Sequence, residues 1–247
     1  MKLLLFFLLT IFSFAGTIKV AVAANVSYAI EALIKDFNKL NPNTNIEVNI
    51  GSSGKLTAQL MQNAPYDIFM SADMGYPEAL YSKGLAVSKP KVYANGSLAL
   101  FTKHNSIDLS KGLNVILDDS IKRVAVANPK TAPYGVATKE ALENAKLYDK
   151  VKPKFIYGQS IGQTLTYTLT AADIGFVAKS TLLSKKLSQY RKGKNWIDVP
   201  LNLYTPTKQC IILIKRAKDN AEAKAFYNYL LSNRAKEIFK KYGYIYR

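Results

Sequence analysis

The stretch Ile50–Leu60, IGSSGKLTAQL, combines glycines, hydroxyls and a lysine where an alternating apolar run gives way to a helical pattern. These are the residue types of a loop that binds a nucleotide phosphate. The phosphate loop of NTPases has the spacing G-x-x-x-x-G-K-[ST]. Here Leu56 follows Gly54-Lys55, and Asn49 stands five residues before Gly54. The spacing fails at both ends, which excludes an NTPase.

Ser52 and Ser53 leave two interpretations of this loop open. A serine between a strand and a helix can cap the helix by accepting a hydrogen bond from its free amides. The same free amides, together with hydroxyl hydrogens, can instead donate to a bound anion. One such loop does not decide between a cap and a site.

The same design recurs in three further loops. AANVSYA (23–29) follows the first strand-like run, and KTAPYGVA (130–137) and GQSIGQT (158–164) each open a helical pattern. None of the four loops contains an arginine, and we expect Lys55 to point along its helix. A hydrogen bond to a charged group contributes about 1.5–3 kcal/mol, so several neutral donors can hold an anion without a counter-charge.

The elements that must position these loops alternate between strands and helices. Strands are predicted over 17–24, 46–51, 67–73, 123–129, 152–158 and 172–179 and in the run CIILIK, and helices over 30–40, 55–64, 75–83, 135–147 and 160–169 and in two C-terminal segments. This alternation predicts an α/β fold with two units, each a largely parallel sheet flanked by helices. Ligands of such sheets bind at the carboxyl ends of strands, where helices begin.

The first residues, MKLLLFFLLTIFSFAG, carry one positive charge and then a short apolar run, with small residues at Ser13 and Ala15. This is the pattern of a secretory signal peptide cut after Ala15. The run is shorter than the ~20 apolar residues that a membrane span requires. We therefore expect residues 1–15 to be removed and the protein to be exported.

The composition is strongly basic, with 34 Lys+Arg against 17 Asp+Glu and a formal net charge of +17. Such a charge can indicate nucleic acid, anionic lipid or the steering of an anionic ligand. The lysines are spread along the chain, with the densest group at 179–196, and no nucleic-acid motif accompanies them. The pattern favours a solvated surface that modestly assists anion capture, and we expect no nucleic-acid partner.

Residues for catalysis or for a resident metal are scarce. The chain has one histidine, His104, and one cysteine, Cys210, too few for a usual zinc site. Asp67 and Asp73 flank a strand and are interpreted as structural caps or turn contacts. Ser97 lacks the second glycine of a nucleophile elbow. We predict no enzymatic activity, no cofactor and no metal held by direct protein coordination. An exported enzyme acting on phosphate or ester substrates is the alternative from a different class.

Four segments of the chain resemble the periplasmic molybdate-binding proteins, the substrate-binding components of molybdate ABC transporters. They are VAANVSYAIEAL, GSSGKLTAQLMQNAPYDIFMSAD, NPKTAPYGVATKEAL and FYNYLLSNRAKEIFKKYGY, and the resemblance runs over essentially the whole mature chain. It implies a two-lobed periplasmic-binding-protein fold with the ligand in the cleft between the lobes. The lobes would comprise 16–95 with 206–247, and 96–205.

The resemblance also implies the ligand contacts Asn25, Ser53, Tyr134 and Ile161. Ser53 would donate through its hydroxyl and amide, and Tyr134 and Ile161 through backbone amides. Asn25 stands where many relatives have serine, and its side-chain amide would donate in its place. Ala178 stands where many relatives have a tyrosine whose hydroxyl meets the anion. That donor is missing from this chain, unless Tyr134 or Asn25 compensates.

The function implied is high-affinity capture of molybdate, and tungstate with it, by a monomer that closes like a hinged clamp. Crossovers near 94–97 and 203–208 would form the hinge. The anion would then pass to an inner-membrane ABC permease with a cytoplasmic ATPase. A binding protein for another tetrahedral oxyanion, whether tungstate-selective or specific for sulfate or phosphate, is the alternative within the same class.

Overall fold

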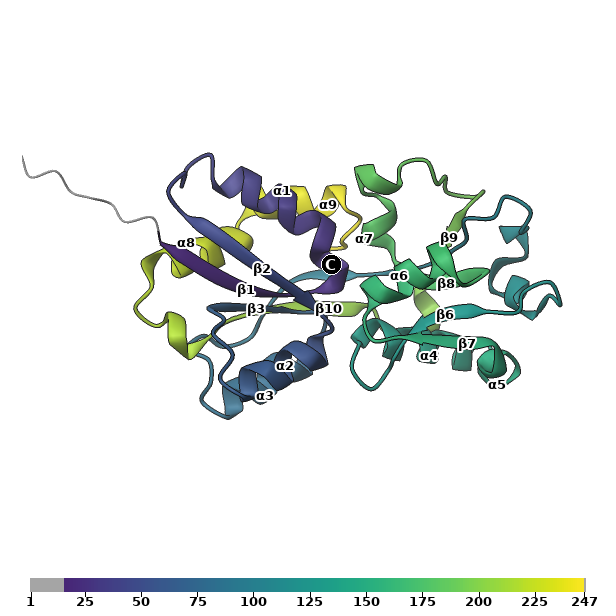
Figure 1. Cartoon of the computed structure of the whole chain (residues 1–247), viewed down its shortest axis with the longest axis horizontal. Helices are drawn as coiled ribbons and strands as arrows, with labels where there is room; N and C mark the ends of the chain where they lie inside the picture. The colour runs from purple at the N-terminus through teal and green to yellow at the C-terminus, as the bar shows by residue number, and fades with distance from the viewer. Residues whose placement is uncertain (1–15, 247) are drawn as a thin grey trace, which may run out of the picture.

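A computed structural model describes residues 16–246 of the chain, which form two five-stranded sheets side by side along the long axis (Figure 1). The first sheet has the order β2-β1-β3-β10-β4 and the second β7-β6-β8-β5-β9. The strands of the first are β1 Thr17–Ala23, β2 Asn45–Gly51, β3 Ile68–Ser71, β4 Lys91–Gly96 and β10 Thr207–Leu213. Those of the second are β5 Leu98–Phe101, β6 Val124–Ala127, β7 Phe155–Gly158, β8 Ile174–Ala178 and β9 Trp196–Asp198.

Helices flank both sheets. The first has α1 Ser27–Phe37, α2 Ser53–Met61, α3 Gly75–Ser82, α8 Ala221–Leu230 and α9 Asn233–Lys241, and the second has α4 Pro133–Asn144, α5 Tyr148–Val151, α6 Ile161–Thr170 and α7 Lys179–Leu182. Six 3-10 segments complete the described chain: η1 Ala24–Val26, η2 Leu109–Leu117, η3 Lys152–Lys154, η4 Lys185–Leu187, η5 Leu201–Leu203 and η6 Lys215–Ala217. The predicted α/β architecture of two helix-flanked sheets is confirmed.

Each sheet is mixed rather than nearly all parallel. β1 runs parallel to β2 and β3, and β6 runs parallel to β7 and β8. β10 is antiparallel to both of its neighbours, as is β5 in the other sheet. A parallel neighbour requires a crossover connection, usually a helix. β5 and β10 instead arrive directly from the other sheet, so they are free to run in the opposite direction.

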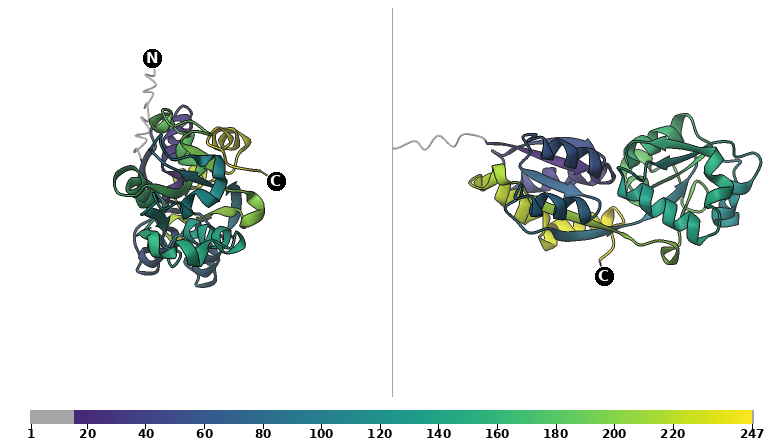
Figure 2. Two further views of the ribbon diagram at one scale, coloured as in Figure 1. Left: turned by 90° about the vertical axis from the view of Figure 1, so that its right-hand side faces the viewer. Right: turned by 90° about the horizontal axis from the view of Figure 1, so that it is seen from below.

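Two connections join the sheets at the centre of the molecule (Figure 2, right). The chain leaves the first sheet at Gly96, the last residue of β4, and enters the second at Leu98. It returns from β9 through η5 into β10. Thr207 of β10 pairs with Gly96 of β4, so the outgoing and returning segments lie side by side.

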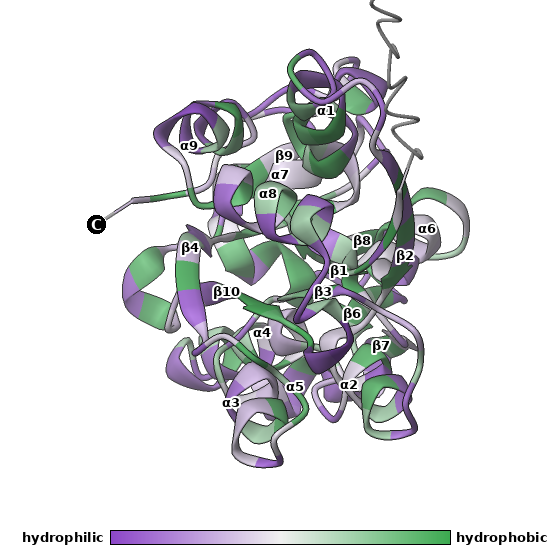
Figure 3. Cartoon of the chain, turned by 90° about the vertical axis from the view of Figure 1, so that its left-hand side faces the viewer, coloured by the Kyte–Doolittle hydropathy of each residue, from purple (hydrophilic) through white to green (hydrophobic). Residues whose placement is uncertain are grey.

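Apolar side chains cover both faces of each sheet. In Figure 3 the strand β10 is drawn largely in the green of apolar residues, whereas α9 is mixed. The buried side of α9 contributes Phe239, whose ring meets Tyr244 edge-on at 5.3 Å between centroids. Fully burying a side chain of this size contributes about 1.5–3 kcal/mol, so such contacts hold the C-terminal helices on the first sheet.

The predicted signal peptide, residues 1–15, lies outside the described part of the chain. Over residues 16–246, we find no helix whose length and hydropathy would suffice to cross a membrane.

Candidate functional site

The four loops singled out in the sequence converge on one cavity between the sheets. Asn25 and Ser53 reach it from the carboxyl ends of β1 and β2, and Tyr134 and Ile161 from those of β6 and β7. The cavity has a volume of about 10 Å³, comparable to the space for one water molecule. All four side chains are at most 5% exposed. The strand-to-helix loops of both sheets therefore face each other across a small space.

Ser52 and Ser53, where β2 gives way to α2, have different roles. Ser52 is the N-cap of α2, and its hydroxyl accepts a hydrogen bond from the Lys55 amide at 3.4 Å. Ser53 Oγ accepts from the Ala72 amide at 3.0 Å, which leaves its own hydrogen available to donate. The capping and anion-binding interpretations of this loop are thus both possible at once, on neighbouring residues.

The loops of the second sheet contribute backbone donors. The first amides of a helix have no partner within the helix. Pro133 is the first residue of α4 and has no N–H, so the first amide donor of that helix is Tyr134. Ile161 is the first residue of α6, and Ser160 caps that helix by accepting from the Gln163 amide at 3.2 Å. Both helices begin at the cavity wall.

The side-chain amide of Asn25 already donates hydrogen bonds to other residues of the protein. Its Nδ2 donates to Gln209 Oε1 at 2.7 Å and to the Tyr244 hydroxyl at 3.0 Å. Its Oδ1 is buried and has no hydrogen-bond partner within the described residues. Donation to an anion by the side-chain amide stays a prediction. With both N–H groups already used, the donor that Asn25 has left for the cavity is its backbone amide.

The cavity wall carries no charged side chain. Lys55 is exposed and lies outside the cavity, as expected. Asp73 lines a neighbouring cavity of about 310 Å³ that shares Ala72 and Pro133 with the first. Burial raises the pKa of the Asp73 carboxyl above its ordinary 3.8, although hydrogen bonds from Tyr76 and Ser71 oppose this. Over residues 16–246, no group of three His, Cys, Asp or Glu side chains is arranged to hold a metal ion.

Direct contacts close the space between the sheets. The Gly54 amide donates to the Thr131 carbonyl at 3.0 Å, and the Ser180 hydroxyl donates to the Asn25 carbonyl at 2.8 Å. A Cβ on Gly54 would lie 2.7 Å from the Tyr76 hydroxyl and 3.0 Å from that Thr131 oxygen. A larger residue at this position would require the Tyr76 side chain to move and the Thr131 backbone to shift by a few tenths of an ångström. Lys186 adds an exposed ion pair with Glu31 at 3.3 Å.

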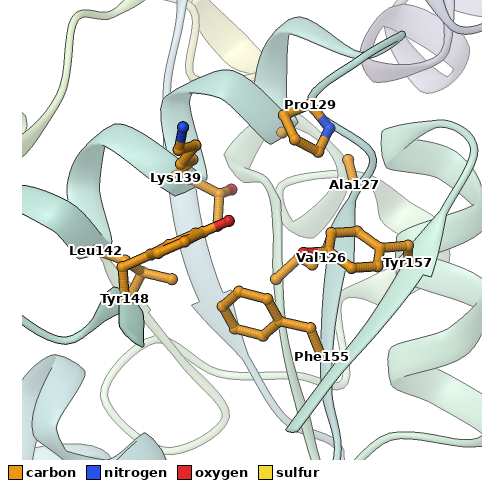
Figure 4. Close-up of a pocket in the computed structure, with 10 residues that line it drawn as sticks. Val126, Ala127, Pro129, Lys139, Leu142, Tyr148, Phe155 and Tyr157 are labelled. Carbon is orange, nitrogen blue, oxygen red and sulfur yellow. The ribbon is translucent and has the colours of Figure 1, made fainter. Parts of the chain in front are cut away.

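A second small cavity, also of about 10 Å³, lies between α4, α5 and β7 (Figure 4). Its wall is formed mainly by apolar and aromatic side chains, among them Tyr148, Phe155 and Tyr157. Lys139 is its one charged neighbour, and this ammonium lies 5.8 Å from the Tyr148 ring centroid. Without converging amides or hydroxyls from several loops, this cavity is a packing gap rather than an anion site.

Several residues of the site were not predicted from sequence. Gln209, Tyr244 and Ser180 all hydrogen-bond to Asn25, and Ala72 orients Ser53. They come from distant parts of the chain. Ala72 and Tyr244 lie within segments that carry the family resemblance, but the local pattern did not mark either of them as a site residue. Ala178 is fully buried in β8. The Tyr134 hydroxyl, one of the groups considered as a replacement for a tyrosine there, is buried without a hydrogen-bond partner among residues 16–246.

Comparison with known proteins places this geometry in context. Residues 18–245 match the family model described as bacterial extracellular solute-binding protein. The molybdate-binding protein ModA of Rhodobacter capsulatus is 35% identical over 233 residues, which cover 94% of this chain and 89% of the relative. ModA of Azotobacter vinelandii is 33% identical, with 93% and 90% covered. The solved Azotobacter vinelandii periplasmic molybdate-binding protein superposes with a TM-score of 0.86 at 30% identity, covering 93% of this chain and 99% of that one.

Proposed function

Because this chain belongs to the bacterial extracellular solute-binding proteins, in the group of the molybdate-binding proteins, we propose that it captures molybdate, and tungstate with it, for delivery to an ABC permease. Proteins of this family bind solutes and are not enzymes. The observation that carries the proposal is the convergence of Asn25, Ser53, Tyr134 and Ile161 on one cavity.

The chemistry of this wall suits a fully ionised oxyanion. The Ser53 hydroxyl and the amides of Tyr134, Ile161 and Asn25 are all donors, and each hydrogen bond to an anion contributes about 1.5–3 kcal/mol. A site made of donors disfavours a phosphate that still carries a proton, because that proton would meet another donor. Sulfate carries no such proton, so cavity size must separate it from the larger molybdate.

Entry of the anion requires the loops to separate. The cavity of about 10 Å³ has room for about one water molecule, and the Gly54–Thr131 hydrogen bond holds the loops of the two sheets together beside it. We propose that residues 16–95 with 206–247 and residues 96–205 act as two lobes that hinge about the paired segments at Gly96 and Thr207. The lobes would close around the anion and open at the permease, in the manner of a hinged binding protein. The working form would be a monomer.

Titration calorimetry of the purified mature protein with molybdate, tungstate, sulfate and phosphate tests this proposal. We expect tight binding of molybdate and tungstate and weak or no binding of sulfate and phosphate. Tight sulfate binding without molybdate binding would instead favour the alternative function, a binding protein for another oxyanion. Absence of heat with all four anions would overturn both.

A further inference from the structure

A buried polar hub, formed by the side chains of Gln209, Thr207, Tyr244 and Ser180, lies beside the anion cavity but does not line it. Its centre is Gln209 of β10, which is 0% exposed. Its Nε2 donates to the Thr207 carbonyl at 3.0 Å and to the Thr207 hydroxyl at 2.8 Å. Because the nitrogen is committed to these two oxygens, Oε1 must face the other way, where it accepts from Asn25 Nδ2 at 2.7 Å. Gln209 thus fixes which way the Asn25 amide points.

Further hydrogen bonds complete the hold on Asn25. Tyr244 accepts from Nδ2 and donates its hydroxyl hydrogen to the Asn25 carbonyl, at 3.0 Å each. The Ser180 hydroxyl donates to the same carbonyl at 2.8 Å. A residue held at both its side chain and its main chain cannot turn without breaking buried hydrogen bonds, each of which is expensive to leave unmade. The backbone of Asn25 is therefore set before any anion arrives.

The hub also lies beside Tyr134, which belongs to the other half of the site. A Cβ placed on Gly96 would lie 2.1 Å from the Tyr134 hydroxyl, 2.7 Å from Thr207 Oγ1 and 2.8 Å from Gln209 Nε2. These three polar atoms therefore surround the space that glycine leaves free. The backbone of Tyr134 lies at the cavity wall on the side of the second sheet. Its phenol extends to Gly96, at the junction between the sheets. Burial raises the pKa of this phenol, while the neighbouring Thr207 and Asn25 side chains act in the opposite direction.

We propose that Gln209 is the positioning residue of the anion site. It holds Asn25 directly, and its Nε2 lies with the Tyr134 hydroxyl around the space beside Gly96, so it lies where the donors of the two sheets meet. The inference rests on the proposed oxyanion binding. Donors that are ordered in advance lose less freedom when the anion binds, which favours tight binding. Gln209 itself lies outside the cavity wall and would touch no ligand.

A double-mutant cycle on molybdate affinity tests this role, with the variants Asn25→Ala, Gln209→Leu and the double variant. If Gln209 acts through Asn25, each single change lowers affinity about 10-fold and the double change lowers it no further than the larger single effect. Additive losses, near 100-fold in the double variant, would overturn the proposal. So would an unchanged affinity in Gln209→Leu.

Cys210→Ala is the matched control, since Cys210 is also 0% exposed and adjacent on β10. It should lower the Tm by leaving a small cavity yet keep the wild-type affinity. If Gln209→Leu does not fold, Thr207→Val removes one acceptor of the hub with little change of shape, and we expect a 2- to 5-fold loss of affinity. An unchanged affinity there would count against the proposal. A wild-type protein that binds no oxyanion would instead refute the proposed function itself.

Discussion

The two halves of the candidate site use different chemistry for the same task. The first sheet presents Ser53 through a hydroxyl that the Ala72 amide orients, and Asn25 through a peptide held by buried hydrogen bonds. The second sheet presents Tyr134 and Ile161 through the free amides of helix starts. Side-chain identity therefore matters on one side of the cavity, whereas helix placement matters on the other.

This difference determines what a mutation can reveal. Replacing a side chain deletes a donor from the first half, but it leaves the amide donors of the second half in place. To disable the second half, a substitution must move a helix.

Gly135→Ala should move the start of α4. Its Cβ would lie 2.3 Å from the Ala127 carbonyl oxygen and 2.8 Å from backbone atoms of Asn128 and Pro129, and backbone cannot rotate away as a side chain can. We expect molybdate affinity, measured by calorimetry, to fall by about 100-fold or more, and overpacking to cost about 1–3 kcal/mol of stability. Gly75→Ala is the control, because its Cβ would meet no atom within 4 Å. Wild-type affinity in Gly135→Ala would show that α4 does not contribute donors.

Ser53→Ala and Ser52→Ala should separate the donor from the cap. Ser53→Ala removes the hydroxyl and leaves the buried Ala72 amide unpaired, so we expect affinity to fall by about 10- to 100-fold. Ser52→Ala removes the cap of α2 and should cost about 1 kcal/mol of stability with a much smaller effect on binding. Calorimetry paired with thermal unfolding distinguishes them. Equal affinity losses in the two variants would mean that the serines act only through the helix.

Asp73→Asn should strengthen anion binding, because it removes a negative charge next to the site on the first-sheet side. We expect a gain of about 2- to 5-fold at low salt, as estimated for a screened charge near a protein surface. Burial raises the pKa of this carboxyl, so ionisation weakens the folded state and the Asn variant should not be less stable at pH 7. As the pH falls through that raised pKa, the wild-type carboxyl becomes neutral, so the two affinities should converge. A constant difference across pH would rule out the charge as the cause.

Ile161→Val should change affinity least, by less than about 2-fold, because the amide that faces the cavity is retained. The shorter side chain should cost about 0.5–1.5 kcal/mol of stability, measured by denaturant unfolding. A loss of affinity comparable to that of Ser53→Ala would break the contrast between the two halves, since it would mean that the side chain itself matters.

The parts of the site that follow from local pattern could be predicted from sequence. The periodicity located the strand-to-helix loops, and the recurrence of Asn, Ser and Gly marked them as donor-rich. Long-range partners could not be predicted in this way. Asn25 and Tyr244 are 219 residues apart, and only the packing of the C-terminal segment on the first sheet brings them together. The assignment of Ser52 as cap and Ser53 as donor depends on the position of Ala72, which no local pattern fixes.

In the fold, too, local pattern located the elements, whereas their ends and their sheets depend on long-range packing. The expected helix over 30–40 ends at Phe37, and Leu40 is 72% exposed, because the chain turns toward β2 before the apolar stripe is complete. The chain passes between the sheets within the expected crossover near 94–97, since β4 ends at Gly96 in the first sheet and β5 begins at Leu98 in the second. Sequence indicates where a strand can form, but the sheet that it joins depends on the path of the chain at Ser97.

The amide of Gly54 offers a direct measure of how often the two halves separate. Its hydrogen is held by the Thr131 carbonyl on the opposite side of the cavity, so it is protected from solvent exchange only while the halves are together. Exchange at this single position in the unliganded protein would report the open fraction, and its slowing on addition of an anion would report the closing free energy.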